Sequence, residues 1–131
     1  MIAEALEGKR IAVTGSTGFL GTALVERLLR SVPGCSVVLI VRPGRRGAED
    51  RVRREILRND CFDRLRSEVE DFDGMVAARL VTLAGDVATD GLGHIQNVQI
   101  PVPGRVLDKS FHQNFLDHSF GQRSTTTFLS V

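Results

Sequence analysis

Residues 11–21 read Ile-Ala-Val-Thr-Gly-Ser-Thr-Gly-Phe-Leu-Gly, a short, largely apolar run that leads into three evenly spaced glycines. The run at 11–14 is rich in β-branched residues, which is typical of a buried parallel strand. After the glycines, leucine recurs every fourth residue and predicts a helix, which Pro33-Gly34 ends. The stretch therefore predicts a strand, a tight turn and a helix.

The same alternation continues along the chain. Ser36–Val41 predicts a second buried strand, and Pro43-Gly44 breaks it. We expect a charged helix from Glu49 to Val69 and a third strand from Ala78 to Leu83. The apolar positions along one face of that helix are Val52, Ile56, Cys61, Leu65 and Val69. This order predicts an α/β fold, namely the N-terminal half of a Rossmann-type doubly wound parallel sheet (β-α-β-α-β) with an irregular C-terminal tail.

The composition changes at Gly93. Residues 1–93 contain no His and no Gln, whereas residues 94–131 contain all three His and all four Gln. Alanine behaves in the opposite way, with nine before Gly93 and none after it. Chance in a short segment is one explanation. We favour a different origin for the last third, such as a shifted reading frame or a fused end, because every difference falls on one side of one boundary. We therefore expect a partial domain at 1–93 and a divergent, poorly ordered tail at 94–131.

The tail offers few structural signals. Ile95–Val102 alternates weakly and is interrupted by prolines, and Ser124–Thr127 is a polar β-branched run without an obvious partner. In the doubly wound strand order 3-2-1-4-5-6 the first strand is central, and here a fourth strand is not recognisable. We therefore expect Ile11–Thr14 to be an unprotected sheet edge and the chain to aggregate or to need a partner.

The length of 131 residues suits about one domain. A net charge of +1 gives no general electrostatic case for nucleic acid or a membrane surface. Residues 42–70 hold nine Arg against seven Asp or Glu, which is typical of an ion-paired helix face. The longest apolar run has five residues, and the N-terminus places acids before bases, unlike a secretory signal. We expect no transmembrane segment and a cytoplasmic location, and the oligomeric state stays open.

The glycine-rich turn is the strongest chemical signal. Gly15 permits a tight turn, Gly18 lets a phosphate approach the backbone, and Gly21 lets the helix pack closely on the sheet. Amides at the helix N-terminus then face a pyrophosphate. The candidate cofactor-binding residues of this turn are Gly15, Ser16, Thr17, Gly18, Phe19, Leu20 and Gly21. The alternative is a tight turn without a ligand; a nucleotide triphosphatase loop is excluded because no Lys-Ser or Lys-Thr follows.

Two further segments point to the same cofactor. Arg42 lies 21 residues after Gly21, where an acid would bind the ribose of NAD, and a guanidinium there suits the 2′-phosphate of NADP(H). Arg45 follows, although a solvated basic loop is the alternative. Asp86 and Val87 follow the third strand, and Asp86 either accepts a hydrogen bond from adenine or caps a turn. Residues 1–93 are therefore expected to be a partial NADP-binding domain.

Metal and nucleophile chemistry find no support in the sequence. The three histidines lack metal-ligand spacing, so we expect no metal site. Cys35 and Cys61 form no disulfide framework and are expected to be small buried hydrophobes.

Four segments together resemble the extended short-chain dehydrogenase/reductase superfamily. The turn Thr14–Gly21 is similar to its T-G-x-T-G-F-L-G motif, and three other stretches resemble the fatty acyl-CoA reductase and thioester reductase branch. These stretches are Val38–Pro43, Glu55–Leu65 with its F-D-R-L ending, and Leu83–Val87 followed by Gly91-Leu92-Gly93. The resemblance covers residues 8–93. It implies that Arg42 binds the 2′-phosphate, that Asp86 contacts adenine, and that NADPH delivers hydride to a fatty acyl-CoA thioester.

The resemblance also implies a catalytic Tyr and a Lys four residues apart, and neither is carried over. The chain contains no tyrosine, and neither of its lysines, Lys9 and Lys109, lies in a matching motif. We therefore expect no catalytic residues and interpret the chain as the NADP(H)-binding N-terminal portion of a fatty acyl-CoA reductase-like oxidoreductase, truncated and inactive alone. A non-catalytic nucleotide-binding or regulatory fragment, and one half of a two-chain reductase, remain the alternatives.

Overall fold

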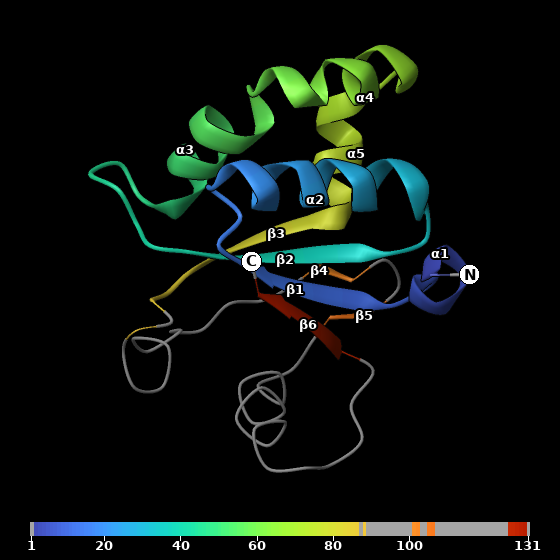
Figure 1. Cartoon of the computed structure of the whole chain (residues 1–131), viewed down its shortest axis with the longest axis horizontal. Coiled ribbons are helices and arrows are strands. Elements are labelled where there is room, and N and C mark those ends of the chain that lie inside the picture. Colours follow the sequence, from blue (N-terminus) through green and yellow to red (C-terminus); the bar gives the residue numbers. More distant parts are fainter. Residues whose placement is uncertain (1, 87, 89–100, 103–104, 107–125, 131) are drawn as a thin grey trace.

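A computed structural model describes residues 2–86, 88, 101–102, 105–106 and 126–130 (Figure 1). Its main sheet has four parallel strands in the order β3-β2-β1-β6. These strands are β1 (Arg10–Thr14), β2 (Ser36–Val41), β3 (Leu80–Ala84) and β6 (Thr126–Ser130). A separate antiparallel pair is formed by β4 (Pro101–Val102) and β5 (Arg105–Val106). The predicted β-α-β-α-β order of the Rossmann-type N-terminal part is confirmed.

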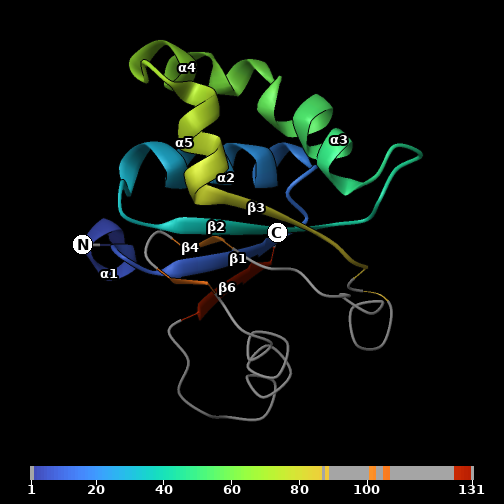
Figure 2. The same ribbon diagram turned by 180° about the vertical axis from the view of Figure 1, so that it is seen from behind.

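Helices cover one face of this sheet. The unpredicted α1 (Ile2–Leu6) precedes β1, and α2 (Phe19–Ser31) connects β1 to β2. The connection from β2 to β3 contains α3 (Ala48–Val52), a π-helical turn at Arg53–Leu57, a 3₁₀ turn at Asp60–Phe62, α4 (Asp63–Glu68) and α5 (Phe72–Arg79). In both views α2, α3, α4 and α5 lie on the same side of the strands (Figures 1 and 2). Both crossovers step in one direction across the sheet, so right-handed connections place their helices on one face.

The hydrophobic core lies between the strands and these helices. Alternate residues of β1 and β2 belong to it, namely Ile11, Val13, Val37, Leu39 and Val41. Val25 and Leu29 of α2 are buried against them, and the ring of Phe62 meets that of Phe72 edge-on at a centroid distance of 6.4 Å. The intervening strand residues Ala12, Val38, Ile40 and Leu83 are buried as well. Burial on both faces explains why the strands read as continuous apolar runs.

The single helix expected at Glu49–Val69 is wrong. The helical path ends after Leu57, and Asn59 adopts an extended conformation with ψ 143°. The Asn59 side chain then accepts a hydrogen bond from the Cys61 amide at 3.1 Å, which caps the next turn. Phe62 therefore takes the buried position expected for Cys61, and Cys61 is exposed; Cys35 is buried as predicted.

The third strand begins later than expected because a helix occupies the preceding residues. Asp71 caps α5 by accepting a hydrogen bond from the Gly74 amide at 2.9 Å, and the helix continues to Arg79. The strand therefore spans Leu80–Ala84 instead of Ala78–Leu83.

The expected open edge at Ile11–Thr14 is also wrong. Strand β6 pairs in parallel with the whole of β1, so that β1 has a neighbour on each side. Thr126 and Thr127 of the run without an obvious partner belong to β6, which occupies the place of a fourth strand. Pro101–Val102, the described part of the weakly alternating Ile95–Val102 run, pairs with β5. Among the described helices, none has the length and apolar character needed to cross a membrane.

Candidate functional site

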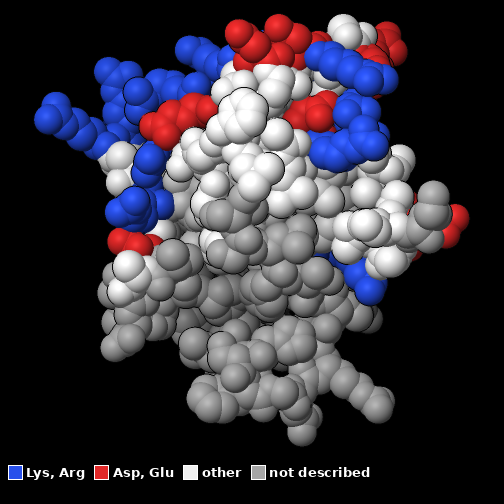
Figure 3. Space-filling model, viewed as in Figure 1, with Lys and Arg blue, Asp and Glu red and all other residues white. Residues whose placement is uncertain are grey.

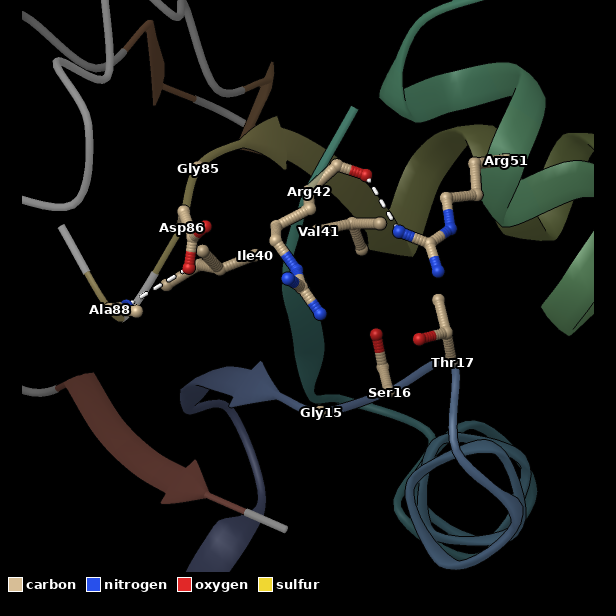
Figure 4. Close-up of a pocket in the computed structure, with 10 residues that line it drawn as sticks. All are labelled: Gly15, Ser16, Thr17, Ile40, Val41, Arg42, Arg51, Gly85, Asp86 and Ala88. Carbon is tan, nitrogen blue, oxygen red and sulfur yellow. Dashed lines mark hydrogen bonds between the residues drawn. The ribbon is translucent and has the colours of Figure 1, made fainter. Parts of the chain in front are cut away.

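A pocket of about 250 Å³ opens at the carboxyl ends of β1, β2 and β3 (Figure 4). Ligands of open parallel α/β sheets bind at this edge, because the loops that follow the strands converge there. Ten residues line the pocket: Gly15, Ser16, Thr17, Ile40, Val41, Arg42, Arg51, Gly85, Asp86 and Ala88. The three segments that the sequence analysis selected, after each of the three strands, are therefore brought together.

The glycine turn is held in shape by its own packing. Gly15 has φ 70°, a left-handed conformation that favours glycine, and a Cβ on Gly21 would lie 2.2 Å from the Gly15 carbonyl oxygen. The buried Thr22 hydroxyl reaches two carbonyl oxygens of the turn, those of Ser16 at 2.9 Å and Gly18 at 2.8 Å. The predicted roles of Gly15 in the turn and Gly21 in close packing match this geometry, whereas Thr22 was not singled out.

Two features of the turn suit an anionic ligand. The Ser16 hydroxyl is buried and has no hydrogen-bond partner among the described residues, although a buried hydroxyl normally has one. A Cβ on Gly18 would meet only the Gly15 carbonyl oxygen, at 3.5 Å, so internal packing does not require glycine there. The first-turn amides of α2 have no intrahelical acceptors. The turn therefore offers an unused hydroxyl and amides to a phosphate group that approaches over Gly18.

Two arginines face the glycine turn from the opposite side of the pocket. The Arg42 and Arg51 side chains extend toward Ser16 and Thr17 (Figure 4). Arg51 Nη1 donates to the Arg42 carbonyl oxygen at 3.1 Å, and Arg51 Nε donates to Glu55 Oε2 at 3.0 Å. Arg51 was not selected from the sequence. The sequence feature that could have identified Arg51 is its position in the first turns of the helix that follows the Arg42 loop.

Arg45 does not line the pocket. Gly44 and Gly47 close a hairpin, with the Gly47 amide donating to the Gly44 carbonyl oxygen at 3.1 Å, and Arg45 and Arg46 are exposed at its tip. The α2 residues Phe19 and Leu20 expose 94% and 67% of their surface and do not line the pocket.

Asp86 lies at the end of the pocket that is farther from Arg51. Its Oδ1 accepts a hydrogen bond from the Ala88 amide at 3.0 Å, which is the turn-capping role, and it also lines the pocket. Both predicted roles therefore remain open. The Gly85 amide donates to the Val41 carbonyl oxygen at 3.0 Å and fixes this end of the pocket to β2. Val87 lies outside the described residues.

Comparison with known proteins gives a consistent result. The NAD-binding family described as male sterility protein matches residues 13–99. Fatty acyl-CoA reductase 1 of Mus musculus is 45% identical over 78 residues, which are 59% of this chain and 15% of that protein. Fatty acyl-CoA reductase 8 of Arabidopsis thaliana is 38% identical over 92 residues, 67% of this chain and 18% of that protein.

A solved structure supports the fold. The reductase domain of a nonribosomal peptide synthetase from Mycobacterium tuberculosis superposes with a TM-score of 0.56 at 23% identity, over 94% of this chain and 24% of that one. The family match and the two fatty acyl-CoA reductases confirm the resemblance found in the sequence. The chain spans about one sixth of the length of the reductases it matches.

Proposed function

The chain belongs to the male sterility protein family of NAD-binding domains, and we propose that its first 93 residues bind NADP(H) as the N-terminal part of a fatty acyl-CoA (thioester) reductase. The observation that carries the proposal is the pair Arg42 and Arg51, both of which line the pocket opposite the glycine turn. An acid at the end of β2 would favour the ribose of NAD, whereas here two guanidinium groups are available for a 2′-phosphate.

Each part of the pocket has a role in this proposal. The turn around Gly18, with the α2 amides and the Ser16 hydroxyl, holds the pyrophosphate. Arg42 and Arg51 hold the 2′-phosphate, and Glu55 orients Arg51 through its hydrogen bond to Nε. Asp86 receives the adenine at the end of β3. When bound, NADPH supplies a hydride for a fatty acyl thioester.

The residues of this chain bind and orient the cofactor, and we propose that they do not complete the reaction. General acid catalysis by a positioned side chain contributes about 10²–10⁴-fold to a rate. The tyrosine that the family resemblance implies as the acid is missing from a chain without any tyrosine. The 131-residue chain is therefore expected to bind NADPH without oxidising it in the presence of a fatty acyl-CoA.

Calorimetric titration with NADPH and NADH tests the proposal. The expected result is tighter binding of NADPH, and loss of that preference in Arg42→Asp, in which the new carboxylate repels the 2′-phosphate. Arg27→Asp is the matched control, because it makes the same charge change at an exposed position outside the pocket lining. Equal affinity of the native chain for both cofactors, or no binding of either, would overturn the proposal.

A further inference from the structure

Charge is distributed unevenly along the connection from β2 to β3. Residues 42–55 carry six arginines against three carboxylates, and residues 60–73 carry six carboxylates against two arginines. Lys and Arg side chains gather over α3 and the loop before it, at the end of the molecule where the pocket opens (Figure 3). A chain of nearly balanced net charge thus presents a positive end beside the pocket.

Ion pairing within residues 42–55 leaves more unpaired arginines than unpaired carboxylates at the surface. Arg54 pairs with Asp50 at 2.8 Å and Arg51 with Glu55 at 3.0 Å, so two of the three carboxylates in this segment are engaged. The remaining carboxylate, Glu49, is exposed. Within the described part of the chain, four arginines of this segment have no carboxylate partner, and we name them the cationic rim: Arg42, Arg45, Arg46 and Arg53.

Only one member of the cationic rim lines the pocket. Arg42 does so, whereas Arg45 and Arg46 lie at the tip of the hairpin closed by Gly44 and Gly47. A side chain at an exposed hairpin tip outside the pocket makes little direct contribution to holding a small ligand. Its charge still acts over about 10 Å at 0.1 M salt and over about 30 Å at 0.01 M.

From these observations we infer that Arg45 and Arg46 steer the anionic dinucleotide into the pocket and set its association rate, while Arg42 and Arg51 hold it. The inference rests on the proposed function. A ligand with a pyrophosphate and a 2′-phosphate is drawn toward a positive surface beside its site, and such fields raise association rates by about 10–10³-fold at low ionic strength.

Association kinetics of NADPH with the full chain test the inference. NADPH fluorescence is a clean signal because the chain has neither tryptophan nor tyrosine. Stopped-flow or NMR line-shape measurements compare the native chain with R45E/R46E at low salt (about 10 mM) and at high salt (about 300 mM). The matched control is R27E/R64E, which makes the same net charge change at exposed arginines of α2 and α4.

We expect R45E/R46E to lower the association rate constant about tenfold at low salt and to reduce its dependence on salt, with the dissociation rate constant within about twofold of native. The control should change the association rate constant by less than about threefold at low salt. An equal effect of both variants, or a change confined to dissociation, would overturn the inference. The proposed function would survive either outcome, since it fails only if the native chain does not prefer NADPH.

Discussion

The guanidinium of Arg79, at the end of α5, donates a hydrogen bond to the carbonyl oxygen of Cys35 at 2.9 Å across 44 residues of sequence. The same side chain donates to the carbonyl oxygens of Leu29 at 2.7 Å and Val32 at 2.6 Å. It therefore satisfies carbonyls at the C-terminal end of α2 and in the loop before β2, and ties them to the start of β3. Three donors in a planar fork suit this task better than the point charge of a lysine.

Replacement of Arg79 should destabilise the fold. Arg79→Met removes a donor from three carbonyl oxygens, of which Val32 keeps the Cys35 amide as a second donor. We therefore expect a loss of about 2 kcal/mol in the free energy of unfolding, and a partial loss in Arg79→Lys. Urea unfolding followed by circular dichroism measures this. Arg27→Met, at an exposed position of α2, is the control, with an expected change within about 0.5 kcal/mol. Equal stability of Arg79→Met and native protein would contradict the capping role.

Two glycines of the turn should separate folding from binding. Gly21→Ala places a Cβ 2.2 Å from the Gly15 carbonyl oxygen, so we expect a destabilisation of about 1–3 kcal/mol. Gly18→Ala meets only an ordinary contact of 3.5 Å, so its unfolding free energy should fall by about 1 kcal/mol or less while NADPH affinity falls at least about tenfold. Thermal unfolding measures the stability of each variant, and calorimetric titration measures its affinity for NADPH. A Gly18→Ala chain with native affinity would show that no phosphate approaches that residue.

Arg51 should determine cofactor preference together with Arg42. Hydrogen bonds to charged groups contribute about 1.5–3 kcal/mol, so Arg51→Ala should weaken NADPH binding by about 10–100-fold. NADH binding should change by less than about threefold, because NADH lacks the 2′-phosphate. Glu55→Gln keeps an acceptor for Arg51 Nε but removes the charge, and a loss of about fivefold or less is expected. If Arg51→Ala weakened the binding of NADPH and NADH equally, Arg51 would maintain the shape of the pocket and would not bind the 2′-phosphate.

The buried thiol of Cys35 should make the stability of the fold depend on pH in the alkaline range. Burial raises the pKa of the Cys35 thiol above its ordinary value, although its hydrogen bond from Arg79 acts in the opposite direction. The unfolded chain therefore ionises this thiol first, and the stability of the fold should decline as the pH rises past the ordinary pKa of a thiol, about 8.5. Unfolding free energies measured between pH 7 and 10 should show a smaller alkaline decline in Cys35→Ala than in the native chain.

Thiol labelling at neutral pH complements that measurement. Cys61 is exposed and should react with a disulfide reagent in the folded chain, whereas buried Cys35 should react only after unfolding. A Cys61→Ser variant makes the labelling rate a direct report on opening of the core around α2 and β2. Rapid labelling of folded Cys61→Ser would show that the core is open.

Local patterns predicted the elements that local chemistry determines. The strand at Ser36–Val41 was located correctly because burial on both faces requires a continuous apolar run. The glycine turn was located correctly because the positive φ of Gly15 favours glycine. The break at Asn59 was missed because the charged helix pattern continues through it, and only the burial of Phe62 shows which register the core prefers. Arg51 was missed because its role depends on how α3 is placed beside β2, which no local spacing specifies.

Strand β6 is the largest departure from the sequence-based expectation, because its pairing with β1 joins segments more than one hundred residues apart. Such contacts depend on the whole fold, and a polar β-branched run carries little information about its neighbour. The consequence is that β1 is an interior strand between β2 and β6.

Hydrogen exchange should therefore show that β1 is protected. With a parallel neighbour on each side, the amides of Ile11–Thr14 should exchange slowly, at rates close to those of β2, and the chain should elute as a monomer. Thr127→Pro places a proline in β6 opposite Ile11, which should weaken the pairing. We expect faster exchange in β1 or self-association through the exposed edge. Glu70→Pro is the control, because Glu70 lies between α4 and α5 and its replacement leaves the sheet intact. Fast exchange of Ile11–Thr14 in the native chain would contradict the pairing and restore the open-edge interpretation.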